Sequence, residues 1–156
     1  MRRVATIGVY GFGIDTFLAA LRGAGVPLIL DVRQRRGVRG SEYAWANSKR
    51  LQAALAEAGI GYEHHPELAP TTELRHLQYA EDARQGVGKR SRSKLAPAYA
   101  EGYTREILDH ADLEPIAAKL PAALMCVERD PEACHRSLVA ARLAEEHGVA
   151  VDHLRP

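Results

Sequence analysis

The segment 126–136, CVERDPEACHR, combines both cysteines of the chain with a histidine, acids and two arginines, which are the residue types of thiol chemistry. The apolar run 121–128, which overlaps its start, predicts a buried strand, and the pair Asp130-Pro131 predicts that a helix begins directly afterwards. Cys134 then falls in the first turns of that helix, whose positive end lowers the pKa of a thiol. We therefore predict that Cys134 is a catalytic nucleophile.

Three neighbours of Cys134 complete the predicted catalytic segment. Glu128 and His135 are the expected catalytic partners that tune the thiol, and Arg136 is expected to bind an anion beside the free N–H groups of the helix. The structural alternative is that the cysteines are small buried hydrophobes and that Arg136 pairs with a nearby acid. We favour this alternative for Cys126, which lies inside an apolar run.

A metal site is another interpretation of the same segment. The two cysteines and His135 would need His64 or His65 to complete a ligand set. The cysteines are eight positions apart, unlike those of a zinc knuckle, and the chain has no second cysteine pair. We therefore predict no metal. We predict no cofactor either, because the glycines of segment 8–13 do not form the dinucleotide-binding fingerprint.

A second cluster places four arginines within positions 33–39, with no acid among them. It follows the apolar run 26–32, which predicts a central strand. These cations repel one another unless something compensates them, and we favour a bound anion over a solvated loop in which Asp31 pairs with Arg33. The predicted substrate-binding residues lie at or after the ends of expected strands: Asp31, Arg33, Arg36, Arg136, Tyr10 and His64.

The segment 85–94 has four cations, two glycines and no acid, and its composition predicts an exposed, mobile loop. It lies within a more helical and polar part of the chain, about residues 70–112. Together with the arginines of 33–39 it supports a rival interpretation, a non-catalytic module that binds nucleic acid through these two basic loops.

Short apolar runs alternate with helical patterns along the chain, which is typical of an α/β fold. We predict one three-layer α/β domain over residues 1–156, with a mostly parallel sheet of about five strands flanked by helices. In open sheets of this kind ligands bind at the carboxyl ends of the strands, where the candidate residues are expected.

The composition excludes several classes of protein. With 156 residues, 46% hydrophobic and 26% charged, the chain is neither disordered nor a disulfide scaffold. The formal net charge of +1 confines any attraction for nucleic acid or anionic membranes to local patches. The start of the chain has no apolar core of a signal peptide, and we expect no membrane span and a cytoplasmic location with free thiols.

The chain resembles the bacterial and archaeal domain of unknown function 488 family. The resemblance rests on Thr6-Ile7-Gly8, Asp31-Val32-Arg33, the pattern from Leu51 to Tyr62, and above all the intact segment 124–136. It implies a single α/β domain, with a site that includes Cys126 beside the residues named above, but it implies no reaction. Two departures, Gly8-Val9-Tyr10 for Gly-His-Ser and Leu68-Ala69-Pro70 for Leu-Gly-Gly, fall near strand ends. We therefore expect the substrate or activity to differ from that of typical members, or the activity to be absent.

We therefore expect an enzyme that acts on an anionic small molecule, phosphate-bearing or nucleotide-like, at the carboxyl edge of the sheet. Arg33 and Arg136 would hold the anion, and Cys134 would react. The nucleic-acid-binding module is the alternative.

Overall fold

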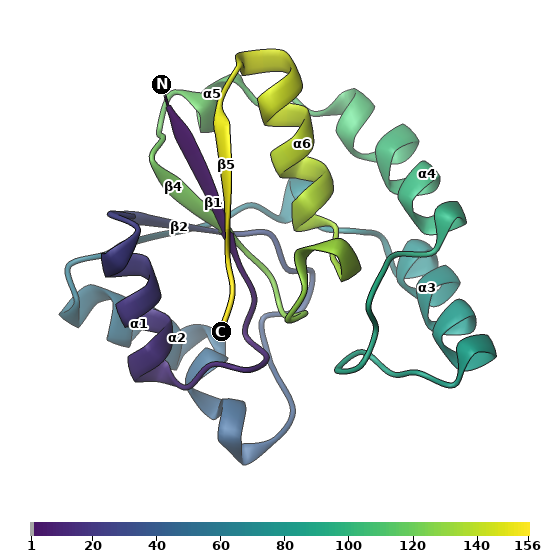
Figure 1. Ribbon diagram of the computed structural model, residues 1–156, viewed down its shortest axis with the longest axis horizontal. Helices are drawn as coiled ribbons and strands as arrows, with labels where there is room; N and C mark the ends of the chain where they lie inside the picture. The colour runs from purple at the N-terminus through teal and green to yellow at the C-terminus, as the bar shows by residue number, and fades with distance from the viewer. Residues whose placement is uncertain (1) are drawn as a thin grey trace.

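Five short strands form one all-parallel sheet in the order β3-β2-β4-β1-β5 in the computed structural model, which describes residues 2–156 (Figure 1). Their bounds are β1 Arg3–Ile7, β2 Leu28–Asp31, β3 Gly61–His64, β4 Ala122–Met125 and β5 Ala150–Leu154. The central strand β4 is completely buried, as its unbroken apolar sequence requires. The predicted α/β fold class is confirmed.

Helices lie on both sides of this sheet, with α1 and α2 on one side and α3, α4 and α6 on the other (Figure 1). Their bounds are α1 Ile14–Gly23, α2 Ser48–Glu57, α3 Thr72–Gln85, α4 Pro97–Glu106, α5 Glu114–Ala117 and α6 Arg136–His147. Short 3₁₀ helices span Ser41–Ala46, Pro66–Leu68, Leu108–His110 and Pro131–Ala133. No helix in residues 2–156 combines the length and the apolar character that crossing a membrane requires.

The strand register brings the carboxyl ends of four strands to one level. Met125, the last residue of β4, pairs with Ile7 of β1 and with Asp31 of β2, and Asp31 pairs with His64 of β3. Because the strands are parallel, the connections that follow them all leave from the same edge of the sheet. The candidate residues that were predicted at strand ends therefore belong to one edge.

The helix predicted to begin at Pro131 begins later. Pro131–Ala133 forms only a 3₁₀ turn, Cys134 is extended with φ −141° and ψ 146°, and α6 starts at Arg136. The Asp130 side chain makes no capping hydrogen bond. Cys134 therefore lies just before the amino end of α6 and not within its first turn, which corrects the sequence prediction.

The predicted loop 85–94 is packed against the rest of the molecule at several points. Helix α3 ends at Gln85, and its C-cap Gly86 adopts the left-handed conformation with φ 71°. Farther on, the Arg92 side chain is buried, and the Leu95 N–H donates to the Glu132 carbonyl oxygen over 3.0 Å. The expectation that this whole segment is exposed is therefore wrong at Arg92, whose charge has partners inside the fold.

Candidate functional site

A cavity of about 770 Å³ opens at the carboxyl edge of the sheet. Its wall is formed by residues that follow β1, β2 and β4, by residues 133–135 just before α6, by α3, and by segment 88–92. This is the place where open α/β sheets bind ligands, and the volume is in the range of small-molecule sites.

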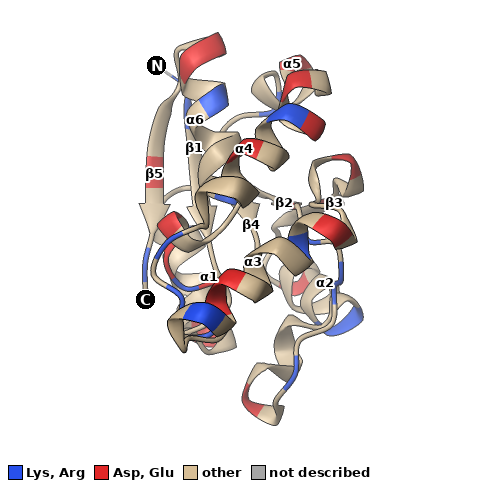
Figure 2. Ribbon diagram, turned by 90° about the vertical axis from the view of Figure 1, so that its right-hand side faces the viewer, with Lys and Arg blue, Asp and Glu red and all other residues tan. Residues whose placement is uncertain are grey.

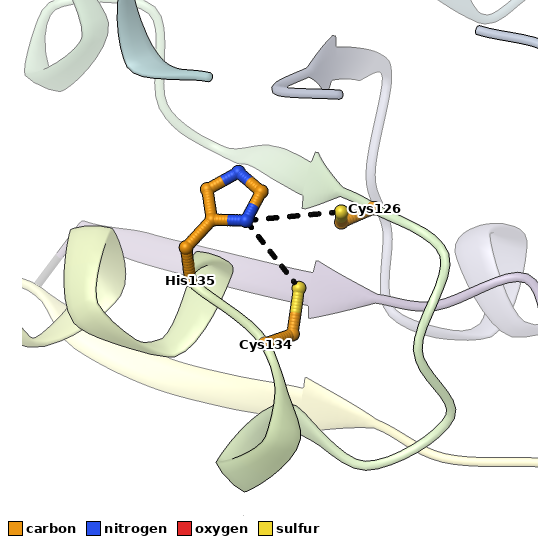
Figure 3. Close-up of side chains that lie close together, drawn as sticks. All are labelled: Cys126, Cys134 and His135. Atoms are coloured by element: carbon orange, nitrogen blue, oxygen red, sulfur yellow. Dashed lines mark hydrogen bonds between the residues drawn. The ribbon is translucent and has the colours of Figure 1, made fainter. Parts of the chain in front are cut away.

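The floor of this cavity holds two thiols around one imidazole (Figure 3). The Nδ1 atom of His135 lies 3.9 Å from Cys126 Sγ and 3.8 Å from Cys134 Sγ, and all three side chains are buried. Both cysteines have free thiols. Cys126 directly follows β4, and Cys134 and His135 directly precede α6. The fold thus brings the two ends of this connection together.

One hydrogen bond fixes the state of this imidazole. His135 Nε2 lies 2.8 Å from the Val32 carbonyl oxygen. A carbonyl oxygen only accepts, so Nε2 carries the proton. In the neutral ring Nδ1 is then unprotonated and faces both sulfurs, where it can accept a thiol proton.

The two thiols differ in their acidity. Burial opposes the Cys134 thiolate, but a hydrogen bond from Cys126 and the charges of Arg136 and His135 hold the pKa of Cys134 well below its ordinary value. The pKa of Cys126 is raised by its hydrogen bond to Cys134 and by burial. The pair therefore favours one thiolate, on Cys134, with Cys126 as its protonated neighbour.

Glu128 is a buried carboxylate on the same floor and is tied to α3. Its Oε1 accepts from Arg92 Nη1 at 3.2 Å, while Arg92 Nη2 lies 2.6 Å from Asp82 Oδ2. Burial and the Cys134 thiolate raise the pKa of Glu128, against the opposing charges of Lys89 and Arg92. Arg92 also donates to the Ala133 carbonyl oxygen at 3.2 Å, so that one guanidinium joins the loop 85–94, α3 and the connection after β4.

Asp31 and Arg33 form a fully buried ion pair. Arg33 Nη2 lies 2.8 Å from Asp31 Oδ2, and Arg33 Nη1 donates to the Ala46 carbonyl oxygen at 2.9 Å. The Tyr62 hydroxyl donates to Asp31 Oδ2 at 2.6 Å. The pairing of Asp31 with Arg33, which the sequence left as an alternative to anion binding, is present. Arg33 lines the cavity and Asp31 does not.

Arg136 is also fully buried, but it faces the backbone and not the cavity. Its Nη1 donates to the Glu128 carbonyl oxygen at 2.6 Å and its Nη2 to that of Arg129 at 3.1 Å. A Cβ added at Gly8 would lie 1.9 Å from the same Glu128 carbonyl oxygen and 3.2 Å from Arg136 Nη1. Arg136 and Gly8 therefore fix the course of the chain that carries Glu128.

Of the remaining predicted binding residues, one lines the cavity and two do not. Tyr10 lines the cavity, and the Arg90 guanidinium carbon lies 5.2 Å from the centroids of both the Tyr10 and the Tyr43 rings. His64 and Arg36 do not line it. His64 Nε2 lies 3.1 Å from the Arg33 carbonyl oxygen, and Arg36 contacts the Tyr62 hydroxyl at 3.4 Å. Five predicted site residues thus meet at the cavity: Tyr10, Arg33, Glu128, Cys134 and His135.

The wall of the cavity is strongly cationic. Among the described residues, the single carboxylate that lines it is that of Glu128. The lining cations within residues 2–156 number seven: Arg33, Arg35, Arg39, Arg75, Lys89, Arg90 and Arg92. Figure 2 shows both signs of charge spread over the molecule, so this excess is a local property of the cavity. Three of these cations, Arg33, Arg90 and Arg92, are paired with carboxylates.

Lys89 is one of several lining cations that the sequence pointed to as part of a nucleic-acid-binding surface. It is partly buried and has no ion pair within residues 2–156. Burial opposes its charge, yet the facing Glu128 and Cys126 raise its pKa, so the ammonium group is maintained. Lys89 is one of four cations in segment 85–94, a composition that predicted a basic loop but did not predict that Lys89 lines the cavity.

The three donors on the floor also form a potential metal-ligand set. The Cys126, Cys134 and His135 donor atoms all lie within 4.8 Å of one another. The spacing of eight residues argued against this set in the sequence. The 3₁₀ turn Pro131–Ala133 reverses the chain and brings the second cysteine back to the first.

Fold and site together define an α/β protein with a thiol–imidazole cluster in a cationic cavity. The family model described as Domain of unknown function DUF488 matches residues 13–143, and the chain belongs to this family. This confirms the resemblance drawn from the sequence. No curated protein and no solved structure matches the chain.

Proposed function

We propose that the chain is an enzyme that attacks an anionic small molecule with the Cys134 thiolate. One observation carries the proposal: the Cys134–His135 pair lies on the floor of a cavity whose wall holds seven cations and one carboxylate. A buried thiol that served only as a small hydrophobe would need neither the open cavity nor an imidazole with its acceptor nitrogen facing the sulfur.

The geometry supports a distinct role for each residue of the pair. His135 Nδ1 accepts the Cys134 proton, and the Val32 carbonyl oxygen stabilises the resulting imidazolium through Nε2. The sulfur then forms a bond to an electrophilic atom of the substrate while the leaving group departs. His135 returns its proton to that leaving group, which balances the step.

The cavity wall favours a phosphate-bearing or nucleotide-like substrate. Arg35, Arg39 and Lys89 have no carboxylate partner among the described residues and can pair with an anionic group. Three tyrosines, Tyr10, Tyr79 and Tyr99, line the same cavity and offer aromatic surface to a base.

Protection from alkylation tests this function. Iodoacetamide should label Cys134 of the reduced, chelator-treated chain, and adenosine monophosphate at millimolar concentration should slow this labelling, whereas uncharged adenosine should not. The variant Lys89→Gln should weaken the protection by the nucleotide. Equal protection by both compounds, or by neither, would contradict an anion-binding thiol site.

Nucleic-acid binding is the second candidate, and one observation favours it. Segment 88–92 contacts the loop after β2, since Arg90 donates to the Arg39 carbonyl oxygen at 3.0 Å, so the two basic loops form one exposed surface. The burial of Arg33 and Arg92 in ion pairs removes two cations from that surface. Binding of a long duplex with a steep loss of affinity on adding salt would support this candidate over the enzyme.

A further inference from the structure

The separations between the floor donors are close to those of a tetrahedral metal site. A zinc ion with bonds of about 2.3 Å to sulfur and about 2.0 Å to nitrogen sets its ligands about 3.5 to 3.8 Å apart. The Nδ1 atom of His135 lies 3.9 Å from Cys126 Sγ and 3.8 Å from Cys134 Sγ. Only a small closing movement separates these side chains from zinc-binding geometry (Figure 3).

The hydrogen bond of the other ring nitrogen of His135, Nε2, is typical of a histidine that binds a metal. Histidines that bind metals generally donate their other ring N–H to a carboxylate or a backbone carbonyl. His135 Nε2 meets the Val32 carbonyl oxygen at 2.8 Å, which turns Nδ1 toward the two sulfurs. The imidazole is therefore held in the tautomer and orientation that a metal at this place requires.

The charge of two thiolates and the carboxylate beside Cys126 also fit a divalent metal. Two thiolates neutralise the charge of Zn²⁺, which limits the repulsion from the cations of the cavity wall. Cys126 Sγ lies 3.5 Å from Glu128 Oε2, so a carboxylate oxygen stands next to one of the three donors. All four residues line the cavity, which gives an ion a route from solvent.

We propose that Cys126, Cys134 and His135 bind Zn²⁺, and that the bound ion masks the Cys134 thiol until it is removed. The metal site stands on the geometry above. The masking rests on the proposed function, because a thiolate that shares an electron pair with zinc is a much weaker nucleophile toward a substrate.

Cobalt binding tests the metal site without reference to activity. The reduced, chelator-treated chain should take up one Co²⁺, show the charge-transfer absorption of thiolate–cobalt bonds, and lose it when one equivalent of Zn²⁺ is added. Each of the variants Cys126→Ser, Cys134→Ser and His135→Asn should weaken binding by about 100-fold or more. The matched control is His65→Asn, a histidine outside the cavity, which should bind as the unaltered chain does.

Alkylation of the same samples separates the two proposals. In the unaltered chain one equivalent of Zn²⁺ should abolish iodoacetamide labelling of Cys134, and a chelator should restore it. Absence of the thiolate–cobalt absorption in the folded, unaltered chain would overturn the metal site and leave the thiol function standing. Cobalt binding with a Cys134 that stays unreactive after metal removal would overturn the thiol function and the masking, but not the site.

Discussion

The floor and the rim of the cavity are built on opposite principles. The floor is buried, and its members contact one another and the backbone: Cys126, Glu128, Cys134 and His135. The rim is more open and cationic: Arg35, Arg39, Lys89 and Arg90. The floor has fixed geometry suited to bond making or metal binding, while the rim has charge left over for a ligand. Reaction and recognition are thus assigned to separate residues that substitution can test one at a time.

The largest effect is expected on the floor. The variant Cys134→Ser should remove rapid labelling of the metal-free chain by iodoacetamide, a loss of about 100-fold or more, because only the thiolate reacts. Cys126→Ser is the matched control and should keep the rapid phase. The labelled residue is identified by peptide mass spectrometry. Labelling that is faster at Cys126 than at Cys134 would reverse the assignment of the nucleophile.

A large effect on stability is expected at Arg136, which holds the connection between β4 and α6. Arg136→Met should lower the free energy of unfolding by about 2 to 4 kcal/mol, because the Glu128 and Arg129 carbonyl oxygens lose buried charged donors. The exposed Arg35→Met serves as control and should leave stability within about 0.5 kcal/mol. Urea denaturation followed by circular dichroism measures both. Equal, small changes would show that Arg136 does not hold this connection.

A smaller effect is expected on the rim. Lys89→Gln should weaken protection by adenosine monophosphate about three- to tenfold, the range expected for loss of one partly buried cation that faces an anion. The rate of labelling by uncharged iodoacetamide should change much less, because the floor is left intact. The control is Lys94→Gln, an exposed lysine of the same segment that does not line the cavity. A matched loss in Lys94→Gln would assign the protection to the general charge of the loop.

The smallest effect concerns pH. A free cysteine is half deprotonated at a pH of about 8.5. The pKa of Cys134 is lowered, so Cys134 keeps its thiolate at pH values below this midpoint. Labelling of the metal-free chain should therefore decline at lower pH than labelling of free cysteine. Stopped-flow alkylation across this range measures the two midpoints. A midpoint for Cys134 at or above that of free cysteine would remove the case for its activation.

The sequence allowed the scaffold and part of the site to be predicted. Unbroken apolar runs gave the strands, and the family motif gave the segment that carries Cys134 and His135. The function of an arginine, by contrast, does not follow from its position after a strand. Arg33 and Arg136 were predicted to bind an anion, but they are held by Asp31 and by backbone carbonyl oxygens that only the folded chain brings to them.

Two further features depended on tertiary contacts. Asp130-Pro131 is a strong helix-start signal, yet the chain makes a 3₁₀ turn there and extends at Cys134. This detour brings Cys134 back toward Cys126 across eight residues, which linear spacing did not suggest. The basic composition of segment 85–94 predicted an exposed loop, but Asp82 and Glu128 draw Arg92 into the interior.

The central claim, a reactive thiol in a cationic cavity, is tested most directly by comparing two alkylating reagents that differ in charge. The rate of labelling of Cys134 by anionic iodoacetate is divided by its rate with uncharged iodoacetamide, and the same ratio is measured for free cysteine at the same pH and salt. The ratio for Cys134 in the metal-free chain should exceed that for free cysteine, and Lys89→Gln should bring it down. A ratio for Cys134 at or below that of free cysteine would contradict the claim, because a cavity lined by unpaired cations attracts the charged reagent.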